Sequence, residues 1–130
     1  MNTLVSFELA KLLKGKGFDV RTKKAFYPDG RECNYYPYDN LGENDSYFWR
    51  PTITEVVMWM YEKQGIWIAI ECDVYGKEWY PKLFVASEEL WADLDRRNKV
   101  VSASQKLLNV NTTPRGAFEA AIEYTLNNLI

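Results

Sequence analysis

The sequence contains no histidine and only two cysteines, Cys33 and Cys72, which lie far apart along the chain. Without histidine, the side chain that most often acts as a general base or a metal ligand is missing. Two distant cysteines form neither a disulfide framework nor a zinc pattern, and they fit buried thiols in a reducing compartment. We therefore expect no metal ion, no cofactor and no dependence of the fold on disulfides.

Long apolar runs and a strong excess of one charge are also missing. No apolar run reaches the roughly 20 residues that a membrane-spanning helix needs. The start of the chain, MNTLVSFELAKLL, lacks the basic beginning and apolar block of a signal peptide. The net charge is −2 and the pI is near 5.2, so the chain as a whole does not attract nucleic acid or acidic membranes. The sequence predicts a cytoplasmic protein without a membrane partner.

Helix signals are clear in three places. Residues 3–15 carry apolar side chains at helical spacing and are followed by Gly15 and Gly17, with Phe18 placed to fold back on the last turn. In PTITEVVMWMYEKQG, a threonine and a glutamate three residues later form a capping box, and the final glycine ends the helix. Its middle, VVMWMY, is apolar on every side, so we expect this helix to be covered on more than one side. The third helix, residues 114–129, begins with a Thr-Pro cap.

Strand signals come in two pairs. Residues 20–36 predict a hairpin around Pro28-Asp29-Gly30, and their high charge predicts an exposed or edge position. Residues 66–74 predict a strand with alternating faces, followed by a partner strand in which Pro81 indicates a bulge or a free edge.

The segments between the strands and the last helix are less clearly signalled. A short helix is predicted over residues 88–97, whereas residues 99–112 fit a short strand or a helical turn. These elements predict a single α+β domain over residues 1–130, with an antiparallel sheet from two β-hairpins packed with N-terminal, central and C-terminal helices.

The segment NYYPYDNLGENDSYFWRP, residues 34–51, is rich in aromatic rings and does not read as a regular helix or strand. Tyrosine, tryptophan and arginine are enriched in binding hot spots, so the segment is a candidate recognition surface. The alternative is that many of these rings cover the helix that contains Trp59. We expect residues 47–51 to pack beside that helix and residues 39–46 to form a polar turn. The candidate contacts with a partner are Tyr35, Tyr36, Tyr38, Trp49 and Arg50.

The first 24 residues hold six basic residues against two acidic ones, a net charge of +4. Such asymmetry is typical of a nucleic-acid contact, and nearby tyrosines can stack on bases. The alternative is a solvated helix face followed by lysines that protect an edge hairpin. The candidate contacts with nucleic acid are Lys14, Lys16, Arg21, Lys23 and Lys24.

No constellation for catalysis or metal binding is visible. Asp39, Glu43 and Asp45 do not have the spacing of a calcium loop, and turn chemistry explains them equally well. Glu71 and Asp73 lie on one strand face, but the sequence contains no recognisable pair of a nucleophile and a general base. We therefore expect a protein that is not an enzyme.

Three segments, SFELAKLLKGKGFD, PTITEVVMWMYEKQGIWIAI and PRGAFEAAIEYTLNNLI, resemble a set of short uncharacterised proteins carried by phages, prophages and mobile elements of gut bacteria. Those proteins share a P-T-x-x-E/M-V-x-x-W-L-x-E-K-x-G-I-W-I centre and an E-A-x-E-A-A-I-E-Y-x-L-x-N-L-I end. The resemblance implies a phage or prophage context, and it implies no activity, cofactor or catalytic residue. Residues 80–112 depart from the shared pattern.

The sequence as a whole favours a small non-enzymatic phage or prophage accessory protein that acts by protein–protein binding. The aromatic segment and the apolar Trp59 helix would form the contact, with another protein or in a homodimer. The alternative is a nucleic-acid-binding protein that uses the basic N-terminal region.

Overall fold

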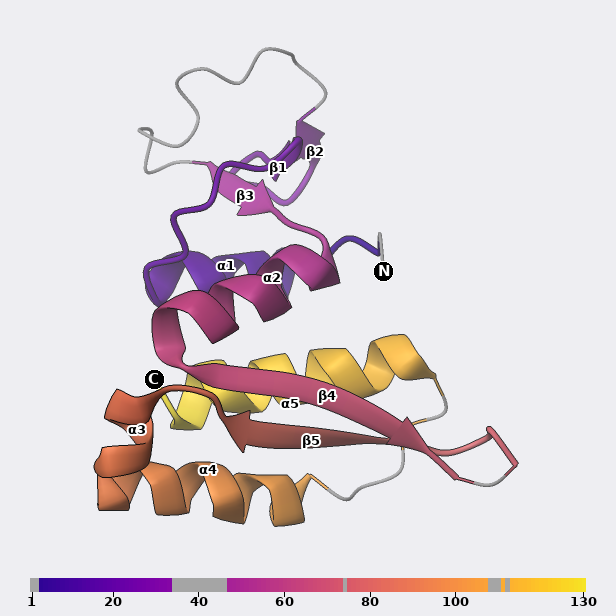
Figure 1. Cartoon of the computed structure of the whole chain (residues 1–130). Coiled ribbons are helices and arrows are strands. Elements are labelled where there is room, and N and C mark those ends of the chain that lie inside the picture. Colours follow the sequence, from indigo (N-terminus) through magenta and orange to yellow (C-terminus); the bar gives the residue numbers. More distant parts are fainter. Residues whose placement is uncertain (1–2, 34–46, 74, 108–110, 112) are drawn as a thin grey trace. The chain divides into compact units, whose positions relative to one another are not determined.

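The computed structural model describes residues 3–33, 47–73, 75–107, 111 and 113–130 (Figure 1). Within these ranges the chain is α+β, with antiparallel strand pairs, as the sequence predicts. In chain order the elements are α1 (Phe7–Gly15), β1 (Lys24–Phe26), β2 (Glu32–Cys33), β3 (Phe48–Arg50), α2 (Ile53–Trp59), the π-helical turn η2 (Met60–Gln64), β4 (Ile66–Cys72), β5 (Trp79–Val85), α3 (Glu88–Ala92), α4 (Leu94–Lys106) and α5 (Pro114–Asn128).

The chain divides into two compact units, Met1–Glu55 and Val56–Ile130. The first contains a three-stranded sheet in the order β2-β1-β3, and the second contains the β4-β5 pair. The two predicted hairpins therefore belong to separate sheets. The assignment of all 130 residues to one domain stays a prediction.

The first hairpin turns where the sequence predicts. The Tyr27 N–H donates to the Arg31 carbonyl at 2.8 Å, and Gly30 has a φ of +91° that favours glycine. However, β3 pairs with the other side of β1, so the expected exposed or edge position is wrong for β1. The expectation that residues 34–51 contain no strand is also wrong at their end. Phe48–Arg50 is strand β3, and the packing of residues 47–51 beside the Trp59 helix stays a prediction.

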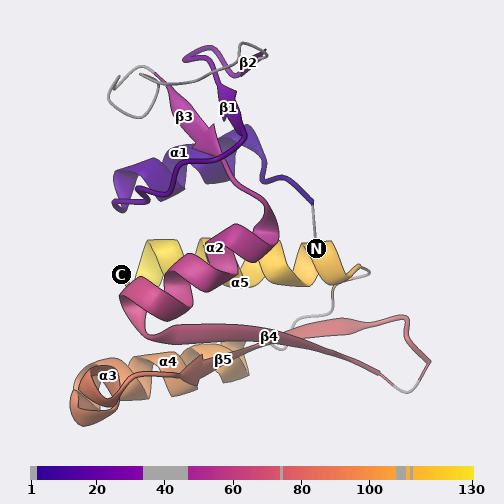
Figure 2. The same ribbon diagram turned by 45° about the horizontal axis from the view of Figure 1, so that its top comes forward.

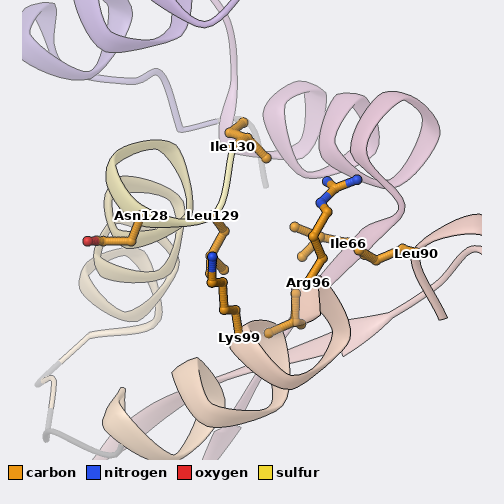
Figure 3. Close-up of a pocket in the computed structure, with 8 residues that line it drawn as sticks. Ile66, Leu90, Arg96, Lys99, Asn128, Leu129 and Ile130 are labelled. Atoms are coloured by element: carbon orange, nitrogen blue, oxygen red, sulfur yellow. The ribbon is translucent and has the colours of Figure 1, made fainter. Parts of the chain in front are cut away.

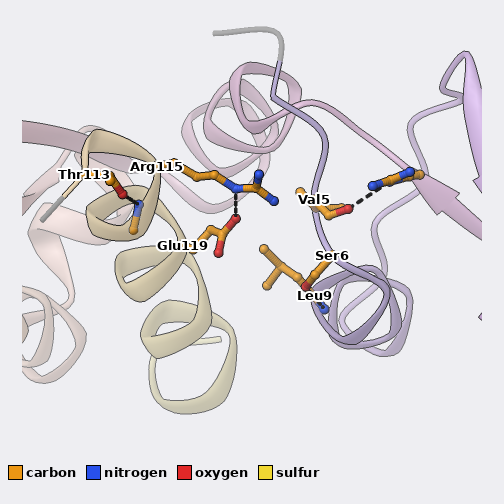
Figure 4. Close-up of polar contacts among 8 residues, drawn as sticks. Val5, Ser6, Leu9, Thr113, Arg115 and Glu119 are labelled. Atoms are coloured by element: carbon orange, nitrogen blue, oxygen red, sulfur yellow. Dashed lines mark hydrogen bonds and ion pairs between the residues drawn. The ribbon is translucent and has the colours of Figure 1, made fainter. Parts of the chain in front are cut away.

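Helix α1 begins at Phe7, four residues later than the sequence predicts. Ser6 caps it by accepting from the Leu9 N–H at 3.2 Å (Figure 4). The residues before it run extended beside the start of α2, and the Val5 N–H donates to the Pro51 carbonyl at 3.0 Å. The predicted glycine ending is confirmed, since the Phe18 N–H donates to the Leu13 carbonyl at 3.0 Å in a Schellman arrangement.

The capping box of α2 is confirmed. The Thr52 N–H donates to Glu55 Oε1 at 2.9 Å, and the Glu55 N–H donates to Thr52 Oγ1 at 3.1 Å. The helix continues as η2 and ends at Gly65, as predicted. Its apolar middle is buried except on one side, where Met58 and Tyr61 remain 39% and 44% exposed.

The β4-β5 pair has a regular register from Ile66 opposite Val85 to Cys72 opposite Trp79. One face carries Ile66, Ile68 and Leu83, which are 0% to 4% exposed. Helix α5 lies along the sheet and contributes its own buried side chains (Figure 1 and Figure 2). This packing forms the core of the second unit. The prediction of two buried thiols is wrong for Cys72, because it lies at the exposed end of β4, whereas Cys33 is buried.

Pro81 sits in a regular register, so the predicted bulge is absent from this described strand pair. Strand β5 lies at the edge of the pair, but other segments occupy that edge on both sides of Pro81. The Ala86 N–H points to the Gly65 carbonyl, so alternate N–H positions of β5 face outward. The Trp79 N–H donates to the Asn111 carbonyl at 2.8 Å. The Leu83 N–H donates to Ser104 Oγ at 2.6 Å, and this hydroxyl donates back to the Leu83 carbonyl at 2.9 Å. Pro81 itself has no N–H to donate. The three successive outward positions Trp79, Pro81 and Leu83 therefore present no unsatisfied donor.

The helix predicted over residues 88–97 is two helices. Asp93 interrupts it and caps α4 by accepting from the Arg96 N–H at 3.2 Å. Helix α4 continues to Lys106, so the described part of the ambiguous stretch is helical through residue 106. The predicted cap of α5 is confirmed, because the Gly116 N–H donates to Thr113 Oγ1 at 3.0 Å (Figure 4).

Candidate functional site

The aromatic segment is described only at its end, since Tyr35, Tyr36 and Tyr38 lie outside the described residues. Trp49 is half-buried and packs on the small cluster of Ala25 and Cys33. Alternation along β3 puts Phe48 on the opposite face, where its ring centroid lies 5.5 Å from that of Phe7 in a T-shaped arrangement. Both rings thus contribute to packing within the first unit.

The Arg50 side chain contacts three other segments of the first unit. Its Nε donates to the Val5 carbonyl at 3.0 Å (Figure 4), its guanidinium lies 4.7 Å from the Phe26 ring centroid, and it pairs with Glu32. Its side chain is 18% exposed. A role for Arg50 in partner contact stays a prediction, and the structure leaves little of its surface for one.

The five candidate nucleic-acid contacts differ in their surroundings. Lys14 is engaged in packing, because its Nζ donates to the Tyr47 carbonyl at 2.6 Å and lies 4.8 Å from the Phe48 ring centroid. The other four are exposed at the end of α1 and along the chain into β1: Lys16, Arg21, Lys23 and Lys24. Lys24 stands opposite Arg50 in the strand register, so two cations adjoin across the β1-β3 pair.

The two carboxylates considered for catalysis have separate roles. Glu71 pairs with Lys82 across the sheet at 3.0 Å. Asp73 lies beyond the end of β4, where its Oδ1 accepts from the Lys77 N–H at 2.8 Å and the Glu78 N–H at 3.1 Å. One carboxylate thus joins two strands, and the other closes the turn. Asp39, Glu43 and Asp45 lie outside the described residues.

A different surface stands out in the second unit, on the side of the β4-β5 sheet opposite its buried face. Trp67 and Phe84 are directly opposite each other in the register and are 38% and 49% exposed. The ring centroids of Tyr61, from η2, and Trp67 lie 5.6 Å apart in a T-shaped arrangement. We call these three residues, Tyr61, Trp67 and Phe84, the aromatic face.

Polar groups continue the same side of the sheet beyond the aromatic face. The Glu71–Lys82 ion pair spans the two strands, and Tyr80 stands opposite Glu71 in the register. The Tyr80 hydroxyl donates to Glu78 Oε2 at 2.6 Å. This hydrogen bond is the largest cause of a raised pKa for Tyr80, above its ordinary value of 10.0. The surface therefore combines apolar rings with polar groups that already have partners.

The sequence contained part of the signal for the aromatic face. The alternation of IWIAIECDV separates Trp67 from the isoleucines, which indicates a half-exposed second face. The position of Phe84 opposite Trp67 depends on the strand register, and the contact of Tyr61 depends on the π-helical turn. Neither can be derived from local residue pattern alone.

In the described ranges, no helix is long and apolar enough to cross a membrane. Among the same residues, no group of three or more cysteine, aspartate or glutamate side chains could hold a metal ion. No protein-family model, curated protein or solved structure matches the chain.

Proposed function

We propose that this chain is a small, non-enzymatic accessory protein that binds another protein through the aromatic face. The observation that carries the proposal is the contrast between the two sides of one sheet. Ile68 and Leu83 are 1% and 4% exposed on one side, whereas Trp67 and Phe84 are 38% and 49% exposed on the other. Large rigid rings of this kind supply much of the binding energy in protein interfaces, because they bury area at low entropic cost.

The exposed area of the aromatic face is large enough to contribute to binding. An aromatic side chain buries ~150–250 Å² in full, so exposures of 38% to 49% leave ~60–120 Å² on each ring. The three rings together offer ~200–350 Å², which reaches the lower end of the ~300–600 Å² exposed by the largest apolar patches on typical monomers. At ~25 cal/mol per Å², covering them contributes ~5–9 kcal/mol before the costs of association.

The polar surroundings support a binding role. Lys82 and Glu71 neutralise each other, and Tyr80 is already bonded to Glu78. A partner that covers the rings therefore leaves these pairs at the rim, where water still reaches them. Interfaces with an apolar centre and a polar rim have this arrangement.

A matched pair of variants tests the proposal. Tagged parent chain, Trp67→Ser/Phe84→Ser and Trp91→Ser are used to capture partners from host lysate, and each captured protein is then purified and titrated. Trp91 is the control because it is 58% exposed and lies on α3, outside the aromatic face. We expect a purified partner to bind the parent and Trp91→Ser equally and to lose affinity for the double variant. Equal binding to all three chains would refute the proposal.

A second copy of this chain is one partner to examine. A homodimer through the aromatic face would show a mass that rises with concentration in light scattering for the parent and for Trp91→Ser. The Trp67→Ser/Phe84→Ser chain would stay monomeric. A strict monomer in all three cases removes the homodimer and leaves a different protein as the partner.

We also propose a phage or prophage origin and a cytoplasmic location. The three segments that carry the resemblance supply α1, the run from α2 into β4, and α5. We expect the transcript to rise when the prophage of a carrier strain is induced, and the protein to fractionate with the cytoplasm. A constant transcript together with recovery in the membrane fraction would contradict both parts.

Nucleic-acid binding is the second candidate function. It is favoured by the exposed cations Lys16, Arg21, Lys23 and Lys24 in the first unit. If Lys23 and Lys24 each contact a phosphate, Lys23→Gln/Lys24→Gln reduces the slope of log affinity against log salt by about 2. The matched control is Lys63→Gln/Lys77→Gln, which removes two exposed lysines from the second unit. The absence of binding to DNA or RNA at low salt would dismiss this candidate.

A further inference from the structure

The apolar side chains of the second unit differ in how far a partner can reach them. A hollow of about 280 Å³ is lined by the beginning of β4, by α3 and α4, and by the end of α5 (Figure 3). Three of its apolar side chains, Ile66, Leu90 and Val100, are 0% to 2% exposed, so they offer almost no surface to a ligand. The rings of the aromatic face are 38% to 49% exposed, so a partner can contact them directly.

The size of the aromatic face favours a short segment over a folded surface as its ligand. A standard protein interface buries ~800 Å² on each partner, of which ~450 Å² is apolar. The exposed fractions of Tyr61, Trp67 and Phe84 leave ~200–350 Å² for contact. A second copy of the chain, or another folded surface, would find less apolar area here than a standard interface contains.

The polar groups of the aromatic face are mainly hydrogen-bond donors. The Trp67 indole N–H and the Tyr61 hydroxyl make no hydrogen bond to any residue that the structure describes. The nearby carboxylates of β4 and β5 already have partners, which are Lys82 and the Tyr80 hydroxyl. The face therefore suits a ligand that presents carbonyl groups and has few N–H groups of its own to satisfy.

Proline-rich segments have this combination of groups. Proline has no backbone N–H, and a polyproline II segment has no internal hydrogen bonds, so its carbonyl groups are free to accept. Its conformation is preset, which lowers the entropic cost of binding to aromatic side chains. The Tyr61 and Trp67 rings lie at 82° to each other with centroids 5.6 Å apart, so they present apolar surface in two directions.

On the basis of the proposed function, we propose that the aromatic face binds a proline-rich segment of its partner in the polyproline II conformation. Proline rings of the segment cover Trp67 and Phe84, which stand opposite each other in the strand register. The Trp67 N–H and the Tyr61 hydroxyl donate to main-chain carbonyl groups of the segment. The ligand carries no required charge, because the Glu71–Lys82 pair beside the rings is neutral as a whole.

Titration of isotope-labelled chain with a blocked peptide of about six prolines, ~19 Å long in this conformation, tests the site by amide NMR. A peptide of equal length with alternate prolines replaced by alanine restores N–H groups, and a leucine–lysine peptide supplies an amphipathic helix as a different occupant. We expect the proline peptide to shift amides around Tyr61, Trp67 and Phe84, and to bind at least about threefold more tightly than the other two. No shifts at the aromatic face up to millimolar peptide, or equal or tighter binding of either control peptide, would overturn the proposal.

A conservative variant tests the hydrogen bond. Tyr61→Phe keeps the ring and removes the hydroxyl, so it should weaken binding of the proline peptide about two- to tenfold. Tyr75→Phe is the matched control, because Tyr75 is 82% exposed in the segment between β4 and β5, outside the aromatic face. It should bind as the parent does. Equal affinity for the two variants would contradict the assigned hydrogen bond.

Competition separates this proposal from the proposed function. The proline peptide is added to the complex of the parent chain with its captured partner, and we expect it to displace that partner. A partner that depends on Trp67 and Phe84 but is not displaced would overturn the proline-rich ligand and leave the proposed function intact. A partner that binds Trp67→Ser/Phe84→Ser as tightly as the parent would refute the proposed function itself.

Discussion

Replacing Gly65 by alanine places a methyl group where the chain passes from η2 into β4. Gly65 has a φ of +70°, in the left-handed region that L residues enter at a cost. A Cβ at this position would also lie 2.3 Å from Ser87 Oγ and 2.8 Å from Ser87 Cβ. Ser87 is the N-cap of α3, so it cannot move without loosening that helix.

The two penalties can be separated. The left-handed conformation costs an L residue ~1–2 kcal/mol, and crowding in a packed site costs ~1–3 kcal/mol. Gly65→Ala should therefore lower the free energy of unfolding by ~2–5 kcal/mol. Gly76→Ala is the matched control, because Gly76 has a φ of +67° and its Cβ would meet nothing within 4 Å. We expect it to cost only the conformational ~1–2 kcal/mol.

Urea unfolding followed by tryptophan fluorescence measures both values. Ser87→Gly removes the two clashing atoms, and glycine at an N-cap costs only a few tenths of a kcal/mol. In the double variant, the crowding term should disappear, so its loss should be smaller than the sum of the single losses. Equal losses for Gly65→Ala and Gly76→Ala, together with strict additivity for the double variant, would refute the assigned packing against Ser87.

Three further predictions concern local contacts. Ser104→Ala leaves the Leu83 N–H and carbonyl without their shared partner, so it should lower the unfolding free energy by ~1–3 kcal/mol. Ser102→Ala, on the same helix, is the control and should be neutral in the same urea assay. Thr52→Ala removes the α2 cap and should lower the unfolding free energy by ~1 kcal/mol in this assay, whereas Thr52→Ser keeps a capping hydroxyl and should be nearly neutral. Because the folded pKa of Tyr80 lies above 10.0, its contribution to stability is complete below that pH and is lost as the pH rises through the folded value. Glu78→Gln should weaken this alkaline loss in urea unfolding measured at increasing pH, and an unchanged pH profile would contradict the assignment.

Local signals explain which elements the sequence predicts. The capping box of α2 and the Thr-Pro start of α5 act within a few residues, so their effect can be derived from sequence. Gly65 and the turn at Gly30 belong to the same class, since each needs a positive φ. These features place two helices and one hairpin before any long-range contact is known.

Elements that depend on contacts between distant parts of the chain cannot be predicted from local sequence signals. Strand β3 is three residues long and exists because β1 supplies its hydrogen bonds. The end of α4 contains valines and serines that do not favour a helix, but Val100 and Ala103 are buried and Ser104 bonds to Leu83. Tertiary packing decides the structure in both places.

The candidate sites also differ in whether local sequence or long-range contacts reveal them. The basic residues of the first unit could be found by counting charge, although the packing of Lys14 could not. The aromatic face requires the register that places Trp67 opposite Phe84. Residues that build a surface from several elements become visible only when the fold brings them together.

The closed outer edge of β5 restricts how a partner can recognise this chain. Strand addition needs outward N–H and carbonyl groups, and those of Trp79 and Leu83 are occupied while Pro81 has no donor. At these three positions of β5 a partner therefore finds no free N–H group, so its contacts along this strand edge depend on side chains. Main-chain hydrogen bonding depends little on the sequence of either chain, whereas contacts made by exposed rings depend on which side chains are present. If the aromatic face binds a partner as proposed, exchanging a single ring can change the specificity without altering the backbone of the sheet.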